Sequence, residues 1–223
     1  MIYTFSIWIL PVLIAITFHE AAHAFVARAL GDDTASRLGR VSLNPLKHID
    51  LFGTILLPGF LLLARSPFLF GYAKPVPVKF RALRNPRSGM ILVAAAGPAM
   101  NIALAIAAAL GFRLLGYLPD TAVQWAAENL KNALIINVIL AVFNMFPIPP
   151  LDGGRIVVSL LPNFLALRLA RLDRYGMAIL IALFIVLPML GSQTGVDLSF
   201  VPRLISTCTE TLIALILKVT GNL

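Results

Sequence analysis

Residues 5–30 read FSIWILPVLIAITFHEAAHAFVARAL, the first of several apolar runs in the chain that approach the length of a membrane-spanning helix. About 20 apolar residues are needed for a helix to cross the hydrocarbon core of a bilayer. No charged side chain occurs from Ile2 to Phe18, yet His19, Glu20 and His23 then follow within about one helical turn. Because ionisable groups are costly to bury in a membrane, this cluster requires a compensating partner.

The composition places the whole chain among membrane proteins. Its 223 residues are 59% hydrophobic and only 13% charged, which is far from the balance of a soluble domain. The net charge of +8 does not indicate nucleic-acid binding, because the cations lie in loops between apolar runs and are not interleaved with stacking aromatics. The single cysteine, Cys208, excludes an internal disulfide, and we assign it no catalytic role.

The later apolar runs predict a helical bundle. They cover residues 51–64, 89–115, 133–146, 175–190 and 204–217. The run 51–64 is short and contains Pro58-Gly59, so it is either a thin span or a re-entrant segment. The stretch GYAKPVPVKF, residues 71–80, favours an edge strand or an extended hairpin. The predicted fold class is therefore an all-α polytopic membrane protein with about five to six transmembrane or re-entrant helices and a short membrane-associated β-hairpin or extended segment.

The distribution of cations predicts the orientation in the membrane, because cytoplasmic loops are enriched in Lys and Arg. If residues 51–64 re-enter the bilayer, 15 of the 18 cations fall on one side, and only Arg113, Lys131 and Arg203 fall on the other. If residues 51–64 cross fully, a cation-rich loop moves outside. We therefore favour the re-entrant arrangement, with the N-terminus outside and the C-terminus cytoplasmic.

The HEAAH stretch has the spacing of a metal site. Residues four apart lie on one face of a helix, so His19 and His23 can direct their imidazole nitrogens at one metal ion. Glu20 lies beside His19 and can take a proton from water at that metal without ligating it. This H-E-x-x-H pattern is typical of zinc proteases. The alternative is two histidines satisfied by backbone carbonyls beside a paired glutamate, but the position within a membrane span favours the metal site.

A catalytic zinc usually has three protein ligands and one open position, so a third ligand is expected. Asp152, in NMFPIPPLDGGR (residues 144–155), is the only carboxylate between Glu128 and Asp173. The prolines before it must end the preceding helix. Asp152 then begins the next helix, where one carboxylate oxygen can accept a backbone N–H while the other ligates the metal. A plain N-cap is the alternative, and the HEAAH helix makes metal ligation the favoured interpretation.

Three stretches, FHEAAHA, AAGPAMN and FNMFPIPPLDGGR, occur in this order on successive apolar helices and resemble the site-2 protease family of intramembrane zinc metalloproteases. VSLNPLKHID and GYAKPVPV resemble its compact bacterial and archaeal branch, which lacks a PDZ or CBS domain. The resemblance covers about residues 15–160. It implies a three-helix catalytic core that cleaves a substrate helix within the bilayer. It also implies one zinc ion per chain, held by His19, His23 and Asp152, with Glu20 as the base.

These observations lead us to expect one intramembrane metalloprotease domain over residues 1–223, with a catalytic core at about 1–165 and accessory helices at about 166–223. The expected function is zinc-dependent endopeptidase cleavage of transmembrane segments near the cytoplasmic side of the bilayer. The expected location is a prokaryotic plasma membrane, crossed several times. The expected partners are a membrane-spanning protein substrate and the lipid bilayer, with no nucleic acid. The substrate's identity and the oligomeric state stay open.

Four further features have assigned roles. The resemblance points to Asn144 as a polar group facing the site, where it can donate to a developing oxyanion; an interhelical hydrogen bond is the alternative. Asn101 is assigned mainly to helix packing, with Gly97 allowing close approach. His48 is expected to be structural. Residues 73–78 are expected to hold the unwound substrate as an added strand.

Two rival functions remain open. A transporter or ion-relay protein could use His19, Glu20 and His23 to carry protons; it predicts no tightly held zinc and no specific inhibition by chelators. An inert membrane scaffold could bind the metal without chemistry. It predicts that Glu20→Gln leaves function intact while His19→Ala does not.

Overall fold

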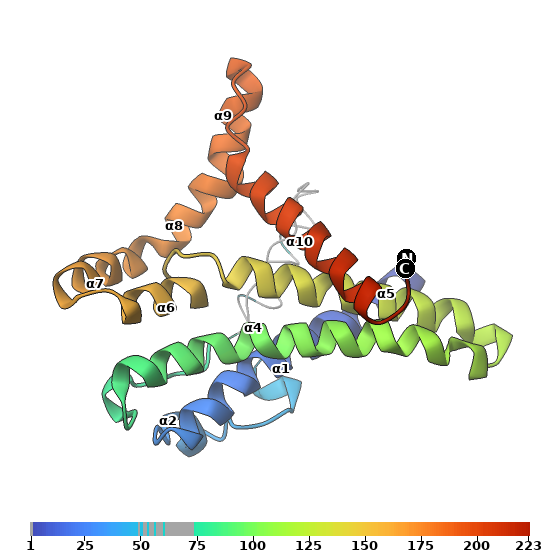
Figure 1. Ribbon diagram of the computed structural model, residues 1–223, viewed down its shortest axis with the longest axis horizontal. Helices are drawn as coiled ribbons and strands as arrows, with labels where there is room; N and C mark the ends of the chain where they lie inside the picture. Colours follow the sequence, from blue (N-terminus) through green and yellow to red (C-terminus); the bar gives the residue numbers. More distant parts are fainter. Residues whose placement is uncertain (1, 49, 51–52, 54–55, 57–59, 61–73) are drawn as a thin grey trace.

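The computed structural model describes residues 2–48, 50, 53, 56, 60 and 74–223, and their arrangement is shown in Figure 1. The α-helices are α1 (Ile2–Ala29), α2 (Thr34–Arg37), α4 (Pro86–Gly111), α5 (Asp120–Asn144), α6 (Asp152–Leu160), α7 (Asn163–Ala170), α8 (Gly176–Ile181), α9 (Leu187–Thr194) and α10 (Phe200–Val219). Short helical turns are η1 (Pro45–Lys47), η3 (Phe80–Ala82), η4 (Phe112–Tyr117), η5 (Arg171–Tyr175) and η6 (Ala182–Val186). None of these described residues forms a β-strand.

The predicted all-α polytopic fold is confirmed. Within the described part of the chain, five helical stretches are long and apolar enough to cross a membrane: Tyr3–Ala29, Pro86–Tyr117, Asp120–Asn144, Asn163–Thr194 and Phe200–Val219. The predicted β-hairpin is not shown: residues 74–79 are extended without strand pairing, and 71–73 lie outside the described residues. Most of the 51–64 run also lies outside them, so its re-entrant path stays a prediction.

Helices α1, α4 and α5 pack side by side as a three-helix core, as Figure 1 shows. Alanines make this packing close. Ala105 and Ala109 of α4 are fully buried against Leu134 and Val138 of α5, and Ile216 of α10 covers the same cluster. Small side chains let helix backbones approach in a membrane, where apolar surface alone gives no preference for protein over lipid.

The end of α10 and the beginning of α1 both contact the end of the core where α4 ends and α5 begins. Arg113, just after α4, donates to the carbonyl of Thr220. Near the start of α5, the indole N–H of Trp125 donates to Ser6 Oγ at 3.1 Å. This packing differs from the predicted arrangement, in which the two ends lie on opposite sides of the bilayer. Which side of the membrane each end faces stays a prediction.

Candidate active site

Two histidines of α1 and the first residue of α6 converge in the buried core. The Nε2 atoms of His19 and His23 are 3.0 Å apart, and Asp152 Oδ2 lies 3.2 Å from the first and 3.3 Å from the second. All three residues are buried, and their candidate ligand atoms lie within 4.8 Å of one another. The structure therefore brings together the three residues that the sequence predicts as metal ligands, although Asp152 is 133 positions from His19 and 129 positions from His23 in the chain.

The hydrogen bonds on the far side of each imidazole decide which nitrogen faces this point. His23 Nδ1 lies 2.7 Å from the carbonyl oxygen of Val93, so Nδ1 carries the proton and donates it. His19 Nδ1 lies 2.6 Å from Asn101 Oδ1 and donates in the same way. In the neutral imidazoles, both Nε2 atoms then present lone pairs to the common point.

A chain of amides from α5 fixes the orientation of Asn101. Asn137 Nδ2 donates to the Ala133 carbonyl at 2.8 Å, which leaves Asn137 Oδ1 to accept from Asn101 Nδ2 at 2.8 Å. Asn101 also donates to the Ala15 carbonyl at 3.2 Å, so its Oδ1 must face His19. Backbone carbonyls of α5 and of α1 thus determine, through Asn101 of α4, the tautomer of His19 on α1. Outer hydrogen bonds of this kind commonly orient metal-binding histidines.

The donor set fits a divalent cation. Two imidazole lone pairs and one carboxylate oxygen meet at a buried point, and Asp152 Oδ2 has no hydrogen-bond partner among the described residues. Three acceptors so close together repel one another unless a positive charge lies between them. Nitrogen and carboxylate ligands in a set of three, with a cavity beside them, are those of a catalytic zinc site.

Gly97 of α4 lets the two helices approach closely at the site. A Cβ at this position would lie 2.5 Å from His23 Nε2 and 2.6 Å from His19 Nε2, well inside van der Waals contact. Any other residue therefore displaces the imidazoles. The prediction that Gly97 allows close packing is consistent with this contact, which is made with the histidines themselves.

Two glycines bring Asp152 into the site. The preceding stretch ends α5 at Asn144 and turns through its prolines, and α6 begins at Asp152. A Cβ at Gly153 would collide with the carbonyl of Met145, and one at Gly154 with the backbone of Ile148. The glycines therefore allow α6 to lie directly against this turn. The predicted N-cap hydrogen bond from the Asp152 carboxylate is not among the side-chain caps that the described residues show.

Glu20 lies beside the three candidate ligands but is not one of them. It lines a small cavity of about 100 Å³ together with His19, His23 and Asp152. Its Oε2 accepts a hydrogen bond of 2.8 Å from the backbone N–H of Val76, in the extended segment 74–79. The segment that was expected to hold the substrate therefore also holds this carboxylate.

Buried charges fix the extended segment in place. Arg40 is buried and donates to the carbonyls of Pro75 at 2.7 Å and Lys74 at 2.5 Å. At the other end, Asp32 Oδ2 accepts from the backbone N–H of Lys79 at 2.6 Å. Burial raises the pKa of Asp32, but hydrogen bonds from the Thr34 side chain and from the backbone N–H groups of Lys79 and Thr34 outweigh this effect and hold its pKa below the usual range.

The hydrogen bonds of this segment limit how a substrate strand can pair with it. Lys74, Val76 and Lys79 already donate their N–H groups to His48, Glu20 and Asp32, and the two prolines have none. Among residues 74–79, only the Val78 N–H makes no such bond to another residue that the structure describes. An added strand would therefore have to rely on the carbonyl groups of the segment as acceptors.

The structure also shows the positions of Asn144 and His48, for which the sequence predicted roles. Asn144 lines the small cavity, and its Nδ2 donates to the Leu140 carbonyl of its own helix at 3.0 Å. His48 is buried, and its Nε2 bonds the Ser42 carbonyl at 2.8 Å, outside the metal cluster. Sequence reasoning missed Asn101 as a partner of His19. The available signal was a polar residue four positions after Gly97, on the same face of α4.

The fold and the cluster define a class: a polytopic helical membrane protein with a buried His-His-Asp cluster that could hold a metal ion. The sequence profile described as peptidase family M50 matches residues 7–127 and 113–187. The chain belongs to this family, which is the site-2 protease family.

Two curated relatives extend this comparison. "Putative zinc metalloprotease YwhC" of Bacillus subtilis (strain 168) is 37% identical over 184 residues, which cover 79% of this chain and 79% of the relative. "Putative zinc metalloprotease Rip2" of Mycobacterium tuberculosis (strain ATCC 25618 / H37Rv) is 29% identical over 184 residues, covering 82% of this chain and 68% of the relative. No solved structure matches the chain.

Proposed function

We propose that this chain is a zinc-dependent endopeptidase that cleaves transmembrane segments of membrane proteins within the bilayer, near its cytoplasmic side. The observation that carries the proposal is the convergence of the buried His19, His23 and Asp152 beside Glu20, at a small cavity that all four line. Membership of a peptidase family and the names of the two relatives support the same reaction class. One zinc ion per chain would be held by the two Nε2 atoms and Asp152 Oδ2.

The metal, when bound, would polarise the scissile carbonyl and make water a nucleophile near neutral pH. Glu20 takes a proton from the water as the water oxygen attacks the carbonyl carbon. It later gives that proton to the leaving nitrogen as the C–N bond breaks. Its Oε2 is held by the Val76 N–H, so Oε1 is the atom available for proton transfer. The products are a carboxylate and an amine.

Asn144 is proposed to face the substrate carbonyl. Its amide has two N–H groups, and one is used by the Leu140 carbonyl. The second is available for the developing negative charge on the carbonyl oxygen. Loss of one such donor costs about 3 kcal/mol where it acts on the transition state.

The site is proposed to open toward the cytoplasm. The elements α2, α6 and α7 lie at the end of the core where α1 ends and α4 begins, as Figure 1 shows, and the loops around them and around η3 are rich in Lys and Arg. Positively charged loops stay cytoplasmic. Water can then reach His23, which is six residues from the end of α1, a distance of about 9 Å at 1.5 Å per residue.

Metal analysis and peptide cleavage test the proposal together. Purified protein should contain about one zinc per chain and cleave a membrane-spanning model peptide, and a chelator should abolish the cleavage. Glu20→Gln should retain zinc yet lose about 10²- to 10⁴-fold in kcat. His19→Ala should lose both zinc and cleavage. A protein that holds no zinc, or whose Glu20→Gln variant cleaves normally, would refute the enzyme and leave the transporter or the scaffold.

A further inference from the structure

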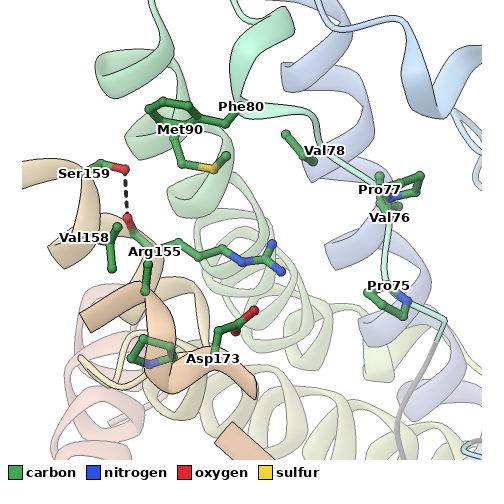
Figure 2. A pocket seen from close by; sticks show the side chains of 12 residues that line it. Pro75, Val76, Pro77, Val78, Phe80, Met90, Arg155, Val158, Ser159 and Asp173 are labelled. Carbon is green, nitrogen blue, oxygen red and sulfur yellow. Dashed lines mark hydrogen bonds between the residues drawn. The ribbon is translucent and has the colours of Figure 1, made fainter. Parts of the chain in front are cut away.

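A groove of about 480 Å³ lies directly beside the small cavity that contains the candidate ligands. It is bounded on one side by residues 75–80 and on the other by α6 and the start of η5, as Figure 2 shows. Pro75, Val76 and Arg155 line both the groove and the small cavity. A peptide lying in the groove can therefore continue into the site.

The walls of the groove are mainly apolar, with two charged exceptions. The apolar side chains include Val76, Val78, Phe80, Met90 and Val158, and the charged ones are Arg155 and Asp173. Apolar walls suit the side chains of a transmembrane segment. The two charges are the features that can distinguish one substrate sequence from another.

Arg155 is partly buried and extends from α6 into the space between α6 and the 75–78 segment, as Figure 2 shows. Its guanidinium has no hydrogen-bond or ion-pair partner among the residues that the structure describes. Two other arginines do have such partners. Arg40 binds two backbone carbonyls, and Arg203 binds the carboxylate of Asp197.

The position of Arg155 on its helix explains why it reaches both spaces. It lies three residues after Asp152, so the two side chains share one side of α6, one turn apart. Asp152 faces the imidazoles, and Arg155 lies beside the cavity that they line. A charge held at this position without a partner costs free energy that a ligand of opposite charge can recover.

We propose that Arg155 selects substrates that carry an acidic side chain close to the scissile bond. This inference rests on the proposed protease function and names the substrate class of that site. A carboxylate matches the planar fork of a guanidinium through two parallel N–H···O bonds. A neutral backbone carbonyl would satisfy one donor but leave the charge uncompensated. Asp173 lines the same groove with the opposite charge, so the acidic side chain of the peptide is expected at Arg155 and not at Asp173.

A charge exchange between enzyme and peptide tests the inference. The peptides are membrane-spanning model segments in zwitterionic vesicles, so that no anionic headgroup competes for Arg155. Asp, Asn and Lys are placed in turn at each position around the cleaved bond. At one position, the kcat/KM of the wild type should be at least about tenfold higher for the Asp peptide than for the Asn peptide. A tenfold ratio corresponds to a discrimination of about 1.4 kcal/mol. Arg155→Gln should remove this preference, and Arg155→Glu should shift it to Lys.

Two controls keep the outcomes distinct. Arg171 is exposed in η5 and does not line the groove, so Arg171→Gln should keep the preference of the wild type. If Arg155→Glu does not fold, the wild-type peptide series and Arg155→Gln still show whether Arg155 selects acidic peptides. Equal cleavage of all peptides by the wild type, or an equal loss on all peptides in Arg155→Gln, overturns the selective role and leaves the protease intact. Failure of the zinc-loaded wild type to cleave any peptide overturns both.

Discussion

The Nδ1 atom of His19 lies 2.6 Å from Oδ1 of Asn101, so helix α4 decides which nitrogen of an α1 histidine is free for a metal. The bond belongs to a chain that ends on the Ala133 carbonyl of α5. All three helices of the core therefore contribute to the orientation of one ligand. The zinc affinity of the site should depend on residues that cannot touch the metal.

Asn101→Leu removes the acceptor that fixes the His19 tautomer. We expect zinc affinity to fall by about 10- to 100-fold, as is usual when an outer hydrogen-bond partner of a ligand is lost. Asn137→Leu should lower it less, because it acts through Asn101. Titration with a competing chelator measures the affinity. Asn132→Leu is the matched control: Asn132 is buried on α5 and donates to the Ile7 carbonyl, away from the histidines, so an equal loss there would contradict the specific role.

The hydrogen bond from Val76 to Glu20 gives a second prediction. Val76→Pro removes the N–H that holds Oε2 while keeping an extended backbone. A hydrogen bond to a charged group contributes about 1.5–3 kcal/mol, so kcat should fall by about 10- to 100-fold with zinc content unchanged. Rates and metal content are measured on the same preparation.

Val78→Pro provides the comparison for this variant. Val78 lies two residues further on and packs against the neighbouring buried clusters, and its N–H makes no bond that the described residues show. Its kcat should stay near the wild-type value. If the two proline variants lose the same activity, the effect comes from the segment as a whole and not from the position of Glu20.

Gly97→Ala should destroy the metal site with little change elsewhere. The added Cβ would meet Nε2 of both histidines at 2.5–2.6 Å, so one imidazole must leave the point that it shares with Asp152. Bound zinc and peptide cleavage should both be lost. Gly111→Ala on the same helix meets only the flexible end of Leu130, at 2.8 Å, and should retain zinc. Metal analysis of the two folded variants tests this expectation, and zinc retention in Gly97→Ala would disprove the steric argument.

The convergence of the three candidate metal ligands could be predicted because their signals are local. His19 and His23 are one helical turn apart, and Asp152 is the only carboxylate in a long interval that includes a proline-rich turn. Five apolar helices were also predictable from length and hydropathy. The structural requirements of a membrane span limit the possible arrangements strongly, because every backbone polar group must be satisfied within the helix.

The contacts between distant segments could not be predicted in the same way. Asn101 lies 82 residues from His19, and Val76 lies 56 residues from Glu20. Neither pair of residues can be recognised from its spacing in the sequence, because both contacts depend on how distant segments pack together. The hairpin was predicted because alternating Pro and Val residues are typical of an edge strand. In the structure, backbone groups of this segment instead make hydrogen bonds with the side chains of Arg40, Glu20 and Asp32, and the segment pairs with no strand.

The carboxylate of Asp32 makes the docking of the extended segment dependent on pH. Its pKa is lowered in the folded protein because hydrogen bonds from the Thr34 side chain and from the backbone N–H groups of Lys79 and Thr34 outweigh the effect of burial. A group with a lowered pKa stabilises the fold above its unfolded value of about 3.9, and this contribution is lost as pH falls toward the folded value. Asp32→Asn should therefore lower Tm at neutral pH, and the difference from wild type should shrink as pH falls below about 4.

Thermal unfolding in detergent between pH 7 and pH 3 measures this dependence. Asp33→Asn is the control, since Asp33 is exposed and its side chain caps nothing at the start of α2; its Tm should follow the wild type throughout. Cleavage at neutral pH should also fall in Asp32→Asn, because Lys79 belongs to the segment that positions Glu20 through Val76. A constant Tm difference across the pH range would show that Asp32 acts through packing and not through its charge.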